Sequence, residues 1–144
     1  RLCYAADAIR PIVPLDADRY QQLTATEISL LDQMLFRFGK LQDAIGQRLL
    51  PAILRAGQEW QENQTFLDQL NRLEKLGAIP STTQWIELRD LRNMAMHEYP
   101  DDPRLNAANL NRVFDSIDVL EATLQQAEAY VITHFDLDQP RPSD

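Results

Sequence analysis

Residues 110–131 read LNRVFDSIDVLEATLQQAEAYV, and this stretch decides the fold class. Its apolar side chains recur at alternating steps of three and four residues, which places them on one narrow face of an α-helix. These side chains are Leu110, Val113, Ile117, Leu120, Leu124, Ala127 and Val131. The pattern predicts a long helix from about Asn106 to Phe135. Its narrow apolar seam suits packing in a helical bundle, against a helix of the same chain or of a partner.

A second long helix is predicted upstream of this one. The letters TATE at residues 24–27 have the form of a capping box, in which a threonine and a glutamate close the first turn of a helix. Apolar residues then continue at helical spacing as far as Gly57. Pro51 falls within this pattern, so we expect it to kink the helix rather than end it.

Two shorter helices are expected between the long ones. The first covers about residues 65–77, and Gly77 suits its C-terminal cap. Ser81 or Thr82 is a good N-cap for the second. A proline follows Tyr99 and disfavours the helical conformation there, so this helix should end close to Tyr99.

Composition agrees with an all-α protein. The chain has 144 residues, of which 44% are hydrophobic, and only four glycines, which leaves few turn signals for a sheet of short strands. We therefore predict one bundle of about four main helices plus a short N-terminal segment. Residues 1–16 are interpreted as an arm, residues 17–136 as the helical domain, and residues 137–144 as a flexible tail rich in acidic residues and proline.

The charge and the cysteine content limit the function classes. A net charge of -8 discourages non-specific binding to nucleic acid, although residues 69–112 are locally neutral. Six basic side chains in that region could face a phosphate: Arg72, Lys75, Arg89, Arg92, Arg104 and Arg112. Cys3 is the only cysteine, which excludes an internal disulfide framework and favours a cytoplasmic protein. No apolar run is long enough to cross a membrane, so we expect no membrane partner.

The candidate site is the stretch RNMAMHEYP at residues 92–100. It combines Arg92, Asn93, His97 and Tyr99 at the expected end of a helix. On a helix that advances about 100° per residue, Asn93 and His97 would stack one turn apart, whereas Arg92 and His97 would lie about 140° apart. One copy is therefore a poor clamp, but two copies related by a two-fold axis would line one cleft.

Such a paired site suits cleavage of a phosphodiester without a metal or another cofactor. One imidazole can take the proton of a ribose 2′-hydroxyl, and a second can protonate the leaving oxygen. Guanidinium groups can stabilise the charge that develops on phosphorus. Histidine in general fits both roles, because its unperturbed pKa of roughly 6.5 leaves both forms populated near neutrality.

A purely structural interpretation stays open. His97 and Tyr99 could be a capping and packing pair, and Arg92 could be a surface residue that pairs with an acid such as Glu87. His134, the other histidine, has no arginine or asparagine close in sequence and is interpreted as a surface residue. The acidic residues show no metal-ligand spacing with a histidine, and we expect no metal site.

The pattern Arg92-Asn93-x-x-x-His97-x-Tyr99, at the end of the third helix of a small all-α domain, resembles the signature of the HEPN superfamily. It is most similar to the HepT-like toxins of HEPN/MNT toxin-antitoxin pairs, and the resemblance covers about residues 24–135 in helix order. It implies a homodimeric, metal-independent endoribonuclease with Arg92 and His97 as catalytic residues. Asn93 and Arg89 would support the site and bind the RNA substrate.

The resemblance also implies a partner and a modification. The antitoxin would be an MNT-type nucleotidyltransferase that silences the toxin by transferring AMP from ATP to Tyr99. The alternative is a non-catalytic helical protein that dimerises and binds such a nucleotidyltransferase.

Overall fold

The computed structural model describes residues 1–135, and within them all regular secondary structure is helical, which confirms the all-α class. The tail predicted at residues 137–144 lies outside the described residues. The elements are α1 (Leu2–Ile9), α2 (Ala17–Gln21), α3 (Ala25–Ala44), a π-helical turn η1 (Ile45–Leu49), α4 (Leu50–Ala56), α5 (Phe66–Leu76), α6 (Thr82–Ala95) and α7 (Pro103–Phe135).

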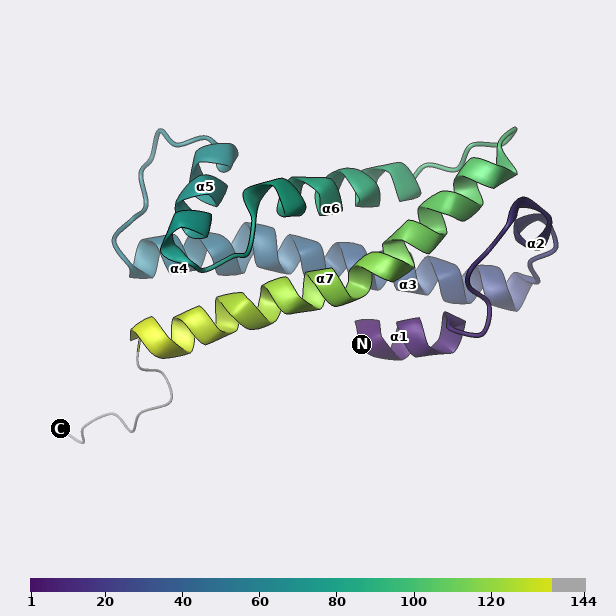
Figure 1. Ribbon diagram of the computed structural model, residues 1–144, viewed down its shortest axis with the longest axis horizontal. Helices are drawn as coiled ribbons and strands as arrows, with labels where there is room; N and C mark the ends of the chain where they lie inside the picture. The colour runs from purple at the N-terminus through teal and green to yellow at the C-terminus, as the bar shows by residue number, and fades with distance from the viewer. Residues whose placement is uncertain (136–144) are drawn as a thin grey trace.

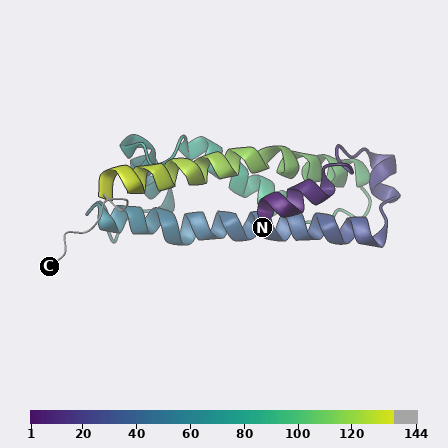
Figure 2. The same cartoon turned by 90° about the horizontal axis from the view of Figure 1, so that it is seen from below.

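The helices form an elongated bundle (Figure 1). The continuous rod of α3, η1 and α4 runs in the same direction as α7, and α6 runs in the opposite direction and packs against both α3 and α7. Figure 2 shows the rod and α7 as two layers along the length of the molecule. α1 packs on α3, α2 on α7, and α5 on α4 and α6. The end of α6 therefore lies where α3 and α7 begin.

The seam of α7 packs inside the same chain. Leu110, Val113, Ile117, Leu120 and Ala127 are all buried, while the other two predicted seam residues are half-buried. The apolar side of α1 is buried against α3 as well. No helix within residues 1–135 has both the length and the apolar character needed to cross a membrane.

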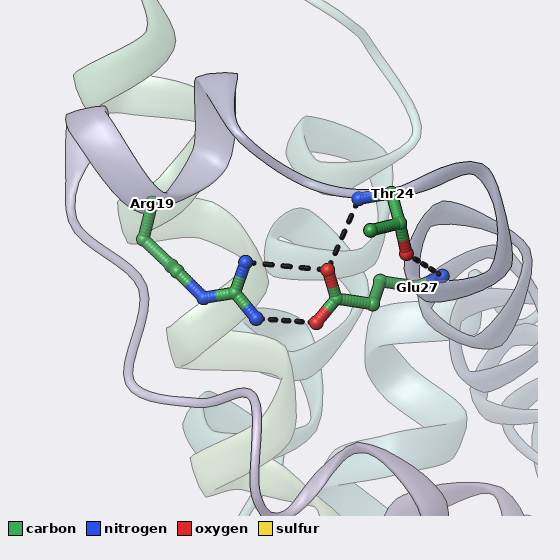
Figure 3. A network of polar contacts seen from close by, with 3 residues as sticks. All are labelled: Arg19, Thr24 and Glu27. Carbon is green, nitrogen blue, oxygen red and sulfur yellow. Dashed lines mark hydrogen bonds and ion pairs between the residues drawn. The ribbon is translucent and has the colours of Figure 1, made fainter.

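The predicted caps hold the helix starts. The Thr24 hydroxyl accepts a hydrogen bond from the Glu27 N–H at 3.1 Å, and the Glu27 carboxylate accepts one from the Thr24 N–H at 3.0 Å (Figure 3). Arg19 of α2 forms a two-pronged ion pair with the same carboxylate. These bonds hold the pKa of Glu27 below its usual value, the Arg19 bond having the larger effect. Gly77 ends α5 with a φ of 85°, as expected of a C-cap.

The long helix continues through Pro51, as predicted, but its irregularity lies upstream of the proline. Residues 45–49 form a π turn in which the Leu50 N–H donates to the Ile45 carbonyl. A proline lacks an N–H and its ring crowds the carbonyl four residues earlier, so a wider turn at this point relieves the contact. A Cβ on Gly46 would lie 2.9 Å from Cζ2 of Trp85, so only glycine lets α6 approach the turn this closely.

Candidate functional site

The motif spans the end of α6 and the loop that follows it. α6 ends at Ala95, so Arg92 and Asn93 are helical, whereas His97 and Tyr99 lie in the loop. The expectation that Asn93 and His97 stack one turn apart on a helix is wrong. The His97 N–H donates to the Met94 carbonyl, three residues back, which tightens the chain as it leaves the helix.

Arg92 faces α3. Its Nη1 lies 3.2 Å from Oδ1 of Asp43, and both side chains are partly exposed. The stem of Arg92 passes over Gly39, where a Cβ would lie 3.4 Å from its Cδ. The arginine therefore pairs with an acid, as the structural interpretation allowed, but the acid is Asp43 of α3 and not Glu87 of its own helix. Its Nε is buried and has no hydrogen-bond partner among the described residues.

His97 is exposed and lines a cavity of about 560 Å³ where α2, α3 and α7 meet the loop. Asp32 and Glu98 are the acidic residues in the lining. Much of the remaining lining is apolar: Leu23, Ile28, Leu31, Leu35, Phe36, Ala95, Met96 and Leu110. The exposed His97 imidazole therefore lies beside an open surface that is mostly apolar.

Arg92 belongs to a different cavity. This one, of about 390 Å³, lies between the C-terminal part of α3, η1, α5 and α6, and Arg89 lines it together with Arg92. The Arg89 guanidinium also lies 5.6 Å from the centroid of the Phe66 ring, within the range of a cation–π contact. One chain therefore places Arg92 and His97, the two residues predicted to be catalytic, in separate cavities.

The loop that carries Tyr99 is fixed through its backbone. Asn106, a buried residue of α7, accepts a hydrogen bond from the Tyr99 N–H at 2.9 Å and donates one to the Tyr99 carbonyl at 2.8 Å. The Tyr99 side chain itself is 36% exposed, and Asn93 is exposed too. The Tyr99 side chain is therefore accessible to solvent, while its backbone is fixed by two hydrogen bonds.

A second contact ties the loop to α2. The Tyr20 hydroxyl donates a hydrogen bond to Oε1 of Glu98 at 3.2 Å. Partial burial raises the pKa of Tyr20, and the adjacent Glu98 carboxylate raises it further. The phenol therefore stays protonated at neutral pH and remains a hydrogen-bond donor to the residue next to His97.

Four residues around the motif were missed from the sequence: Tyr20, Asp43, Glu98 and Asn106. Three of them act across long sequence separations, which spacing within one helix cannot indicate. Asn106 was expected only as the start of a helix, and its polar character at a helix end gave no sign of its partner. Within residues 1–135 no three or more His, Cys, Asp or Glu side chains gather as metal ligands would.

No model of a protein family, no curated protein and no solved structure matches this chain.

Proposed function

We propose that this protein is a HEPN-type toxin, a metal-independent endoribonuclease that acts as a homodimer. One observation carries the proposal: the end of α6 presents an exposed His97 to one cavity and Arg92 to another. The Nε of Arg92 has no hydrogen-bond partner among the described residues. A single chain offers a phosphate one of these groups in each cavity. A dimer in which the two helix ends face each other supplies both kinds of group to one RNA.

An apolar surface beside His97 supports the dimer. Ile28, Phe36 and Met96 line the His97 cavity and are 47%, 52% and 61% exposed. Such a cluster is a candidate interface, because exposed apolar side chains that gather in one place favour association. A two-fold axis through this surface would bring the two copies of His97 close together.

The chemistry follows from two imidazoles in one cleft. The neutral imidazole accepts the proton of a ribose 2′-hydroxyl, and the 2′-oxygen attacks the adjacent phosphorus. The bond from phosphorus to the 5′-oxygen breaks, and the imidazolium of the other protomer protonates that oxygen. The Arg92 guanidinium stabilises the extra negative charge on the phosphorane. The products are a 2′,3′-cyclic phosphate and a 5′-hydroxyl.

Tyr99 supplies a means of control. In the proposed modification its phenol oxygen attacks the α-phosphorus of ATP on a nucleotidyltransferase antitoxin, and pyrophosphate leaves as the phenol proton is lost. AMP on Tyr99 would place a negative charge and a bulky group two residues from His97. Both effects oppose the approach of an RNA phosphate. The exposed phenol and the anchored loop backbone support this role.

A non-catalytic helical partner of a nucleotidyltransferase is the second candidate. Two observations favour it: the net charge of -8, and the ion pair that already engages Arg92. In that case the dimer would accept AMP on Tyr99 without cleaving RNA.

Intact-mass spectrometry and RNA cleavage separate the two candidates. The protein would be produced alone and together with a nucleotidyltransferase encoded beside it, and wild type would be compared with His97→Ala. His134→Ala is the matched control, because His134 is also exposed but, within residues 1–135, bonds only to the Tyr130 carbonyl and stacks on the Tyr130 ring. Cleavage by unmodified wild type and His134→Ala, but not by His97→Ala, supports the nuclease. Equal RNA survival with all three unmodified proteins would reject it.

A further inference from the structure

The cavity between α3, η1, α5 and α6 carries groups that the cleavage chemistry does not use. Its volume of about 390 Å³ is in the range of small-molecule sites, which begin near 300 Å³. Trp85 and Phe66 contribute aromatic rings to its lining, and Arg89 and Arg92 contribute two positive charges. Asp43 is the only acidic residue of its lining and is engaged by Arg92.

Gln42 is the unusual member of this lining. It is only 3% exposed, and neither its Nε2 nor its Oε1 has a hydrogen-bond partner among the described residues. A buried amide that is left unsatisfied loses its hydrogen bonds to water without replacement, so buried amides in folded proteins nearly always have partners. The amide offers a donor and an acceptor side by side, the arrangement found on the hydrogen-bonding edge of a nucleobase.

Arg89 and Arg92 could bind a phosphate group next to the base. The Nε of Arg92 is buried and has no hydrogen-bond partner within residues 1–135, and the exposed Arg89 guanidinium lies over the Phe66 ring. A guanidinium group binds phosphate through charge-assisted hydrogen bonds in a fork geometry. An aromatic wall, an amide and two guanidinium groups therefore match a flat heterocycle that carries a phosphate.

We propose that this cavity binds one nucleotide, with its base against Trp85 and Gln42 and its phosphate at Arg89 and Arg92. The proposal rests on the proposed function in one respect: the nucleotide is taken to be part of the RNA substrate. Because Arg92 also serves the cleavage step, the bound nucleotide would adjoin the scissile phosphate. The enzyme would then prefer particular bases at that position.

Calorimetric titration of the full chain with each of the four ribonucleoside 5′-monophosphates tests the site directly. We expect saturable binding of at least one of them, weakened about tenfold or more by Gln42→Leu, since roughly 1.4 kcal/mol corresponds to a factor of ten. Gln125→Leu is the matched control, because Gln125 is an exposed glutamine of α7 outside this cavity. Arg89→Gln, a change at an exposed position that should not affect folding, should weaken binding by a similar factor.

The inference is overturned if no nucleotide binds the wild type at millimolar concentration. It is also overturned if Gln42→Leu and Arg89→Gln both bind as the wild type does, which would mean that the nucleotide binds outside this cavity. Nucleotide binding without RNA cleavage would instead leave the site standing and reject the nuclease. RNA cleavage with no base preference and no nucleotide binding would reject the nucleotide site and leave the proposed nuclease standing.

Discussion

Arg92 on α6 and Asp43 on α3 form an ion pair with 3.2 Å between Nη1 and Oδ1, although 49 positions separate them in the sequence. The pair joins two helices that run in opposite directions (Figure 1), and both residues line the smaller cavity. A phosphate that binds Arg92 must therefore compete with a carboxylate that belongs to the protein.

Replacement of Asp43 by asparagine should raise the proposed nuclease activity. The amide keeps the size of the side chain but removes its charge, and a partly exposed ion pair is worth at most about 1 kcal/mol. We expect kcat/KM for RNA to rise roughly 2- to 5-fold, mainly through a lower KM, with little change in the urea midpoint. A tenfold fall in kcat at unchanged stability would show instead that Asp43 positions Arg92 for catalysis.

Asn106 and Asn111 give a matched pair of variants on α7. Each amide bonds the N–H and the carbonyl of one loop residue outside α7: Asn106 holds Tyr99, seven positions back, and Asn111 holds Leu15 at 2.7 Å for both bonds. Replacement of either by alanine should lower the free energy of unfolding by about 2–3 kcal/mol, because two bonds are lost. Urea denaturation measures this loss.

Only Asn106→Ala should also alter the chemistry at the motif loop. We expect slower AMP transfer to Tyr99 and weaker RNA cleavage in this variant, measured where both proteins remain folded. If Asn111→Ala impairs both reactions equally, general destabilisation explains the effect and the Tyr99 anchor has no specific role.

The exposed apolar surface beside His97 should control dimer formation. Phe36→Glu places a charge in the proposed interface, so the dimer dissociation constant should rise about tenfold or more and RNA cleavage should fall with it. Leu67→Glu on α5 is the control, because Leu67 is 50% exposed, close to the 52% of Phe36, and lies outside the His97 cavity. Sedimentation equilibrium and cleavage rates test this, and a wild type that stays monomeric at high concentration would refute it.

Acid should weaken the contact between α2 and α3. The Arg19 bonds and, to a smaller extent, the Thr24 bond hold the pKa of Glu27 below its ordinary value of 4.5. A carboxylate with a lowered pKa in the folded state adds stability that is fully present above its unfolded value and is lost as the pH falls through the lower, folded value. Stability should therefore decline below about pH 4.5, and part of that decline should vanish in Glu27→Gln.

Urea midpoints measured across pH 3–7 would follow this contribution. Glu62→Gln is the reference, because Glu62 is exposed and forms no ion pair within residues 1–135. If Glu27→Gln and Glu62→Gln show the same slope with pH, the ion pair with Arg19 adds nothing.

Local patterns in the sequence predicted most of the helices but few of the contacts between them. The seam of α7, the capping box at Thr24 and the cap at Gly77 are local patterns, and the structure confirms all three. α2 was not expected, because five residues are too few to show a helical period. The early end of α6 was missed because the proline after Tyr99 constrains only the residue before it.

The site was harder to predict than the helices. Its residues were chosen for their chemistry, and the sequence held no information on which α3 side chain Arg92 would meet. Asp43 and Gln42 are adjacent in α3, yet Asp43 is paired whereas the buried Gln42 amide has no partner in the part of the chain that the structure describes. Only the packing of α6 on α3 distinguishes them.

The π turn in the long helix acts as a one-residue insertion. An α-helix rotates by about 100° per residue, so one extra residue turns everything after it by that amount. Ile53 and Leu54 of α4 are buried in this rotated phase, and Gly46 within the turn lets Trp85 close the neighbouring cavity. A regular α-helix over the same residues would turn the α4 face out of the core by about 100°, whereas deletion of one residue between 45 and 49 would close the π turn and keep that face inward. The length of this short segment, more than its composition, sets the phase that joins the two halves of the rod.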